Sequence, residues 1–165
     1  MSVATLVVSF ALGPVPAEKA VTDTEKKQFL EMLRQLPHEG EFYTDEAVAK
    51  AVPYTRVLLA LTDKDLEKRD LYPFLALSRG LFEHKEARTY AVAHFRGIAH
   101  PTIKLFWALI LFDQRASTPE IVRFLREALK SKDKAKWMEE TVGPGFEAFK
   151  KRLIQSPEQE QKSGK

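Results

Sequence analysis

Residues 101–112 read Pro-Thr-Ile-Lys-Leu-Phe-Trp-Ala-Leu-Ile-Leu-Phe, and this stretch decides the fold class of the protein. Proline fits the first turn of an α-helix, because the amide hydrogen that it lacks would have no partner there. The residues from Ile103 to Phe112 are apolar on nearly every side, which is typical of a helix buried among others. We therefore expect a central buried helix with Trp107 in the core, and about a dozen residues are too few to cross a membrane.

Further helices are expected on the carboxyl side of this stretch. Residues 117–120 read Ser-Thr-Pro-Glu, which places a capping hydroxyl, a proline and an acid where the start of a helix favours them. We expect Asp133 to cap the next helix, and the Gly-Pro-Gly run at 143–145 to separate it from a last amphipathic helix. No stretch after residue 20 has the alternation of a strand ladder.

Helix signals also run along the amino side. Thr22 or Asp23 begins a predicted helix through Leu36, and Thr44 or Asp45 begins the next. Each start combines a side chain that can cap the helix with acidic residues in the first turn.

Proline and glycine suggest the boundaries of the two helices before the central one. Pro73 is tolerated in a first turn, so we expect a helix from about Asp70 or Leu71, with a kinked longer helix as the alternative. Gly80 stands where a carboxyl-terminal cap would help. A helix from about Lys85 to Arg96 is expected to follow.

Composition limits the class of protein. The chain has 165 residues, of which 44% are hydrophobic and 30% charged, and no cysteine. These values fit one folded domain, which we place at residues 21–155, followed by a disordered tail at 156–165. The absence of cysteine excludes a disulfide scaffold, a thiolate metal site and a cysteine nucleophile. A net charge of +3 is too small to indicate a partner.

Residues 1–20 form an apolar amino-terminal segment. Residues 3–12 carry no charge, and Val15-x-Ala17 resembles the small-residue cleavage site of a secretory signal. No lysine or arginine precedes the run, although a signal usually carries one. We expect a cytoplasmic protein whose first residues pack on the domain, with export and cleavage after Ala17 as the alternative.

The chain partly overlays itself when it is shifted by 34 residues. The matching positions hold apolar residues through a helix, a turn and a second helix: Val57, Ala91 and Leu125; Leu61, Phe95 and Leu129; Leu71 and Leu105; Leu77 and Leu111. One helix pair cannot bury both of its faces, whereas stacked copies make a continuous core. The sequence therefore predicts an all-α fold built as a short α-solenoid of antiparallel helix pairs, with an irregular helical bundle as the alternative.

The stretch from Tyr54 to Asp133 resembles the HEAT family of helical repeats, most clearly at residues 98–112 and 117–133. The family's usual Asp followed by Val-Arg has only loose counterparts, Asp65 with Arg69 and Asp133 with Lys136. The resemblance implies helix pairs in a right-handed superhelix that serves as a scaffold or binding surface. It brings no catalytic residues. A tetratricopeptide array has a similar period, but its glycine and tyrosine positions are absent.

A protein- or peptide-binding scaffold is the first function that we expect. Its inner groove would be lined by the second helix of each pair, and the candidate side chains for a partner are Arg69, Tyr72, Arg79, Lys104 and Arg115.

Nucleic-acid binding is the second expectation, because residues 115–152 hold ten basic residues against six acidic ones. The candidate phosphate contacts are Arg123, Arg126, Lys130, Lys132, Lys134 and Lys136. The competing interpretation is a solvated face that complements the helix dipoles.

An enzyme with an unrecognised site is the third expectation. The chain lacks a Gly-x-Ser-x-Gly nucleophile motif, a phosphate-binding loop and a His-Glu-x-x-His run. We therefore predict no catalytic residue, no metal site and no cofactor. His94 matches Ala60 and Ala128 in the repeat, so we expect its side chain to be packed or half-buried.

Overall fold

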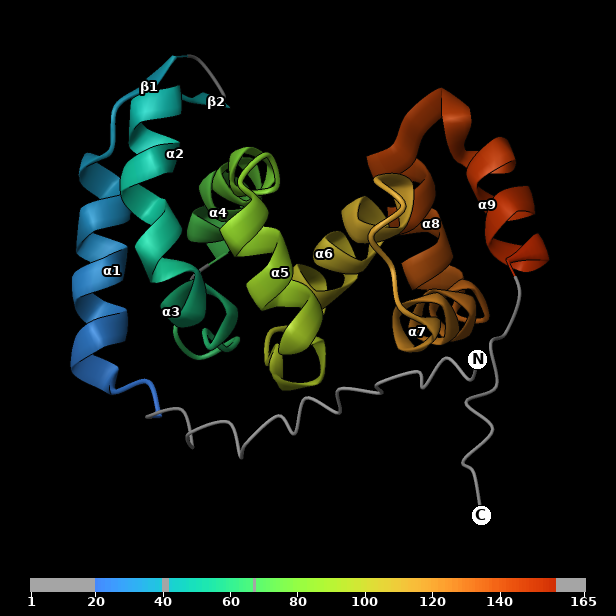
Figure 1. Ribbon diagram of the computed structural model, residues 1–165, viewed down its shortest axis with the longest axis horizontal. Helices are drawn as coiled ribbons and strands as arrows, with labels where there is room; N and C mark the ends of the chain where they lie inside the picture. Colours follow the sequence, from blue (N-terminus) through green and yellow to red (C-terminus); the bar gives the residue numbers. More distant parts are fainter. Residues whose placement is uncertain (1–19, 40–41, 67, 157–165) are drawn as a thin grey trace, which may run out of the picture.

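The protein is all-α, as expected (Figure 1). The structure is a computed structural model that describes residues 20–39, 42–66 and 68–156. The helices are α1 (Asp23–Gln35), α2 (Asp45–Ala51), α3 (Thr55–Leu59), α4 (Lys68–Leu81), α5 (Lys85–Ala93), α6 (Pro101–Asp113), α7 (Pro119–Leu129), α8 (Lys132–Val142) and α9 (Phe146–Gln155). Three 3₁₀ turns join them, η1 (Val52–Tyr54), η2 (Phe95–Gly97) and η3 (Gly143–Gly145).

The predicted starts of α1, α2 and α7 are confirmed. Thr22 caps α1 in a reciprocal capping box, in which the Glu25 amide donates to its hydroxyl at 3.2 Å and the Glu25 carboxylate accepts from the Thr22 amide at 2.8 Å. The hydroxyls of Thr44 and Thr118 cap α2 and α7 by accepting from the amides of Ala47 and Ile121, without the reciprocal bond. These contacts satisfy backbone N–H groups that have no partner inside the helix.

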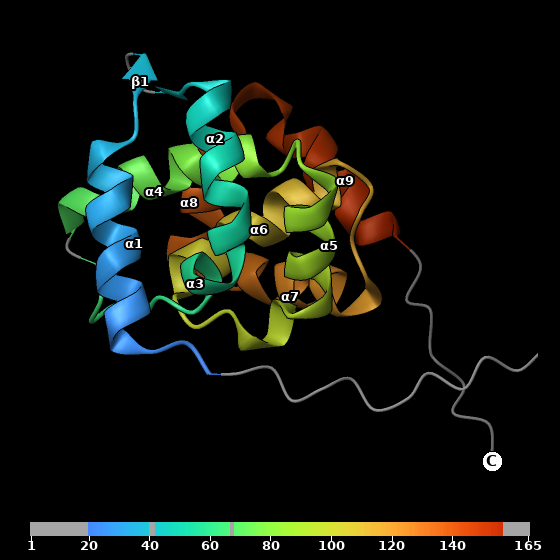
Figure 2. The same ribbon diagram turned by 60° about the vertical axis from the view of Figure 1, so that its left-hand side comes forward.

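In Figure 1 the helices follow one another in chain order from α1 at one end to α9 at the other, and Figure 2 shows the molecule with the end that holds α1 and α2 turned forward. α1 packs against α3, and α3 against α5, while α2 packs against α4, and α4 against α6. Beyond α6, α7 contacts α6, α8 and α9. Contacts therefore join helices that are close in the sequence.

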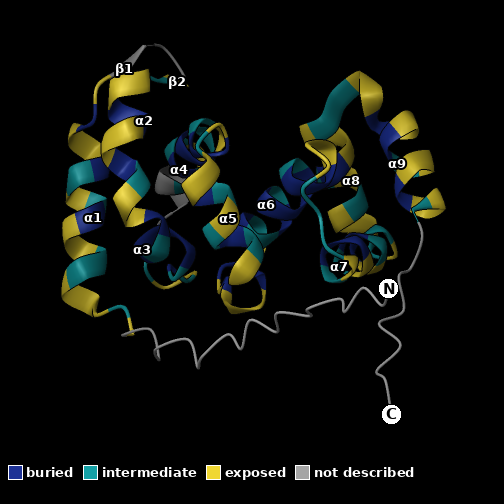
Figure 3. Cartoon of the chain, viewed as in Figure 1, coloured by how far each residue is buried: buried dark blue, intermediate teal, exposed yellow. Residues whose placement is uncertain are grey.

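The central helix α6 lies in the core, as its apolar sequence predicted (Figure 3). Trp107 is fully buried and its ring lies 4.2 Å from that of Phe82. Its indole N–H donates to the buried Ser78 hydroxyl at 3.2 Å, so the one polar group of this side chain has a partner.

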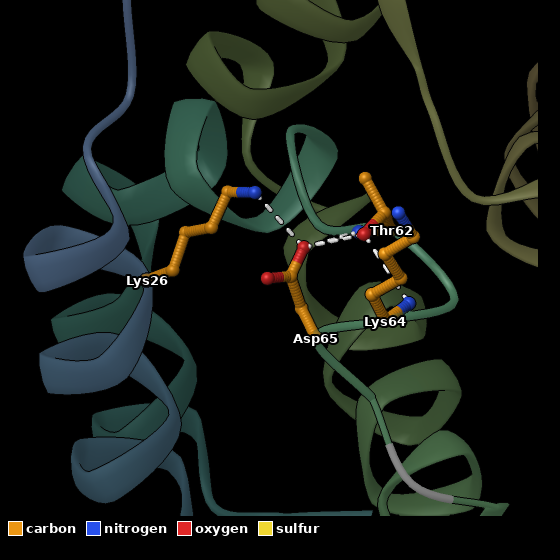
Figure 4. A network of polar contacts seen from close by, with 4 residues as sticks. All are labelled: Lys26, Thr62, Lys64 and Asp65. Carbon is orange, nitrogen blue, oxygen red and sulfur yellow. Dashed lines mark hydrogen bonds and ion pairs between the residues drawn. The ribbon is translucent and has the colours of Figure 1, made fainter.

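Two polar networks tie α1 to the rest of the molecule. The Lys26 ammonium lies 2.9 Å from the Asp65 carboxylate, which also accepts hydrogen bonds from the backbone amide and hydroxyl of Thr62 (Figure 4). Burial raises the pKa of Asp65, but these hydrogen bonds outweigh it and lower the pKa below its usual value. Glu25 has a pKa of about 2, because the Thr22 backbone and hydroxyl donate to it and Arg56 pairs with it at 2.6 Å.

Two boundary predictions before α6 are wrong. α4 begins at Lys68 and not at Asp70 or Leu71, so Pro73 lies inside the helix, as in the alternative of a longer helix. Gly80 also lies inside α4 and does not cap it. A Cβ atom at Gly80 would lie 2.5 Å from a methyl group of Val48, so glycine is the residue that lets α4 approach α2 this closely.

Smaller differences lie in the turns. The strands β1 (His38–Glu39) and β2 (Phe42–Tyr43) form an antiparallel pair that the sequence did not predict. α5 ends at Ala93 and not at Arg96. Asp133 lies in the first turn of α8, whose cap position is Ser131. His94 is exposed and not half-buried, and its ring stacks on Tyr90 at 4.2 Å.

The expectations for the ends of the chain cannot be compared with the structure. The apolar amino-terminal segment, its cleavage site after Ala17 and the tail beyond Ser156 lie outside the described residues. Within the described ranges, no helix has both the length and the apolar character that a membrane crossing requires.

Candidate functional site

A groove of about 610 Å³ opens between the end of α4, one side of α6 and the corner where α8 turns into α9. Its volume lies in the range of ligand-binding clefts. We call it the α4–α6–α9 groove. Its apolar lining consists of Phe106, Leu109, Ile110, Val142, Ala148 and Phe149.

The spacing of residues on α6 explains the floor of the groove. Phe106, Ile110 and Asp113 recur at helical intervals, so they lie on one side of α6. The opposite side of this helix is buried in the core, where Ala108 and Leu111 are fully enclosed. Phe106 and Ile110 are only half-buried. The central helix thus leaves an apolar surface that is open to solvent.

One wall of the groove is held by an ion pair between α6 and α9. The Arg152 guanidinium lies 2.7 Å from the Asp113 carboxylate. It also lies over the Phe112 ring at 4.9 Å and the Phe149 ring at 6.0 Å, and these two rings meet edge to face at 5.1 Å. Arg152 thus links α9 to α6 through a carboxylate and two aromatic rings.

The other wall carries Arg79 near the end of α4 and Glu83 in the turn that follows this helix. Both side chains are exposed and stand four residues apart. Within the described part of the chain, neither forms a hydrogen bond or an ion pair. This wall therefore offers one positive and one negative group to solvent.

The structure does not gather the five predicted partner residues at one place. Arg79 lines the groove, but Tyr72 and Arg115 are exposed outside it. Arg115 lies in the turn after α6, with a positive φ of 57°. Arg69 belongs to α4, and its side chain lies outside the described part of the structure.

Lys104 lies away from the groove, at the amino-terminal end of α6. Its ammonium donates to the Arg96 carbonyl at 3.0 Å and lies over the rings of Phe95 and Phe124 at 5.1 Å and 5.6 Å. These contacts hold the α5–α6 turn against α7, so this side chain has a structural partner on each side.

The six predicted phosphate contacts fall into three groups. Arg126 donates to the Leu153 and Ile154 carbonyls, each at 3.1 Å, and so it satisfies the end of α9. Lys130 pairs with Glu127 at 2.6 Å and Lys136 with Glu140 at 3.8 Å. Arg123, Lys132 and Lys134 are exposed. Part of the positive charge on α7 and α8 is thus neutralised within the fold.

The comparisons identify no relative. No protein-family model, no curated protein and no solved structure matches the chain. Among the described residues, no group of three histidine or acidic side chains is arranged to hold a metal ion. The HEAT resemblance therefore stays a prediction, and the groove itself is the basis for a functional hypothesis.

Proposed function

We propose that the chain is a non-enzymatic helical-repeat scaffold that binds a protein or peptide segment in the α4–α6–α9 groove. The observation that carries the proposal is the apolar strip of Phe106 and Ile110 on α6, which is left half-exposed between two charged walls. An apolar surface with a polar rim is the usual anatomy of a binding interface.

The arrangement of the helices supports a repeat. The 34-residue shift carries Val57 of α3 onto Ala91 of α5 and Leu125 of α7, and all three are buried. It also carries Leu77 of α4 onto Leu111 of α6, and both are fully buried. Buried positions thus recur at the 34-residue spacing, which a stack of helix pairs would produce.

The groove has the character of a binding surface more than that of a catalytic one. Its Asp113 carboxylate is paired with Arg152, and its Thr141 hydroxyl donates to the Trp137 carbonyl at 2.8 Å. A nucleophile would instead need its hydroxyl beside a base.

The test is selection from a displayed peptide library on the full chain, with counter-selection on an Ala148→Trp variant. Ala148 is exposed and lines the groove, so an indole there fills the space without entering the core. The matched control is Ala49→Trp on α2, which is exposed and does not line the groove.

We expect enriched peptides to bind the wild-type chain and the Ala49→Trp variant alike, and the Ala148→Trp variant at least tenfold more weakly. Peptides that bind all three proteins equally, or no enrichment after several rounds, would contradict the proposal. Circular dichroism of the three proteins checks that the fold is unchanged.

A further inference from the structure

The walls of the α4–α6–α9 groove are helices, and this limits the conformation of an occupant. Apart from their terminal turns, the backbone N–H and C=O groups of α4, α6 and α9 bond within their own helices, and no strand lines the groove. An extended peptide would therefore find no strand edge here, and its own backbone groups would be left without partners over the apolar floor. A helical peptide satisfies its backbone internally, so it can bring side chains alone to the floor.

The floor offers a matching apolar strip. Phe106 and Ile110 stand one helical turn apart and are half-buried, and Val142 from α8 lies beside them in the lining. A helix with apolar residues at positions i, i+3 or i+4, and i+7 presents a stripe of the same kind.

The charges distinguish the two walls. Asp113 and Arg152 on the α9 side are paired with each other, and Arg152 also lies over two rings. Arg79 and Glu83 on the α4 side are exposed, stand four residues apart and pair with nothing in the described structure. The complement of this wall is one acidic and one basic side chain separated by a helical turn.

We propose that the groove binds an amphipathic α-helix of a partner protein, whose apolar stripe covers Phe106 and Ile110 and whose acidic and basic residues, one turn apart, face Arg79 and Glu83. The inference deepens the proposed function and rests on it.

The two ends of the chain itself do not have this chemistry. Residues 3–12 are apolar but carry no charge. Residues 156–165 carry charges but contain no leucine, isoleucine, valine, methionine or aromatic residue. Glu18 and Lys19 follow the apolar run but are adjacent in the sequence and not one helical turn apart. Neither end therefore combines an apolar stripe with an acid and a base one turn apart, so a separate partner is the occupant that the charges favour.

The experiment uses a displayed library of helix-forming peptides. Leucine is fixed at i, i+3, i+4 and i+7, and two flanking positions one turn apart are each varied among Asp, Glu, Lys, Arg and Ala. Selection is run on the wild-type chain and on the double variant Arg79→Glu, Glu83→Arg. Both substituted side chains are exposed, and circular dichroism checks that the double variant folds. Fluorescence anisotropy then gives the Kd of each selected peptide for both proteins.

We expect the wild-type chain to select one acid and one base in a fixed order, and the double variant to select the opposite order. Each peptide should bind its own protein at least tenfold more tightly than the other. Proline in the middle of a selected peptide should weaken binding at least tenfold, because it breaks the helix. This set of results is specific to a charged helix in the groove.

The failures can be told apart. If no peptide from either library prefers the wild-type chain to Ala148→Trp, the proposed function fails together with the inference. Two results would overturn only the inference. In the first, Ala148→Trp blocks binding but the order of the acidic and basic residues in the peptide does not change the affinity. In the second, Ala148→Trp blocks binding but the central proline does not weaken it. A wild-type dimer that Ala148→Trp makes monomeric would identify a second copy as the occupant and would also overturn it.

Discussion

The contact between Gly80 and Val48 decides how closely α4 and α2 pack. Alanine at position 80 would favour the helix by up to about 1 kcal/mol in an open setting. Here its Cβ would lie 2.5 Å from a Val48 methyl group, and Val48 is itself buried. Overpacking in a core costs about 1–3 kcal/mol, so the steric term is the larger of the two.

We therefore expect Gly80→Ala to lower the free energy of unfolding by about 1–2 kcal/mol, measured by urea denaturation. Adding Val48→Ala should cost less than the sum of the two single changes, because it removes the clash. Gly97→Ala is the matched control, since nothing lies within 4 Å of a Cβ there. Equal changes in the free energy of unfolding for Gly80→Ala and Gly97→Ala would show that Val48 does not restrict the side chain at position 80.

The role of a single residue could be predicted from the sequence only where its partner lies a few positions away along the chain. The caps at Thr22, Thr44 and Thr118 could be predicted because each acts on an amide three residues away. The role of Gly80 could not, because it depends on Val48 in another helix. Local patterns carry information about local bonds, and only the fold brings the distant partner into place.

Asp65 connects two elements, since it joins α1 to the turn after α3 through Lys26. Its pKa is lowered in the folded protein, so it adds stability above the pKa of the unfolded state, about 3.9, and this stability is lost as the pH falls through the folded pKa. We expect Asp65→Asn to cost about 1–2 kcal/mol at pH 7. The difference from wild type should begin to shrink as the pH falls below about 3.9 and should vanish only below the folded pKa, as measured by urea denaturation across pH.

Asp63→Asn is the control for this experiment. Asp63 is exposed in the same turn and lies outside the network of Lys26, Thr62 and Asp65. Its substitution should leave the free energy of unfolding within about 0.5 kcal/mol of wild type. A loss at Asp65 that persists unchanged at pH 3 would show that the carboxylate charge is not the cause.

Arg126 acts on a whole element, because it donates to the last carbonyls of α9. Hydrogen bonds from a charged donor contribute about 1.5–3 kcal/mol each at most, and part of this arginine is in contact with solvent. We expect Arg126→Ala to lower the free energy of unfolding by about 1–2 kcal/mol and to raise hydrogen exchange at the end of α9.

Arg123→Ala on the same helix is the comparison, since Arg123 is exposed. It should change stability by less than about 0.5 kcal/mol. If Arg126 served mainly to contact phosphate, its replacement would leave stability intact and reduce nucleic-acid affinity in a salt-dependent manner.

At the scale of the molecule, the helical class followed from periodicity but the groove did not. The sequence predicted Arg79 as a candidate partner contact, because it lies on the second helix of a predicted pair. It did not predict the opposite wall of the groove, which Asp113 and Arg152 form. Asp113 and Arg152 pair across 39 residues, and neither has a local pattern that marks it. A weak signal was present in α9, where Phe149 and Arg152 stand three residues apart, but it cannot indicate which ring or acid they meet.

The order of the helices along the molecule predicts which of them open first. α1 lies at one end of the molecule with α3 as its main neighbour, whereas α6 contacts α4, α5 and α7 and holds the fully buried Trp107 (Figure 1). In a stacked array each unit is stabilised by its own packing and by its neighbours, so the ends open first. We expect native-state hydrogen exchange to show opening free energies in α1 and α9 about 1–3 kcal/mol below that of α6. One shared opening free energy across α1, α6 and α9 would instead indicate a closed bundle that unfolds as a single unit, and the repeat interpretation would then fail.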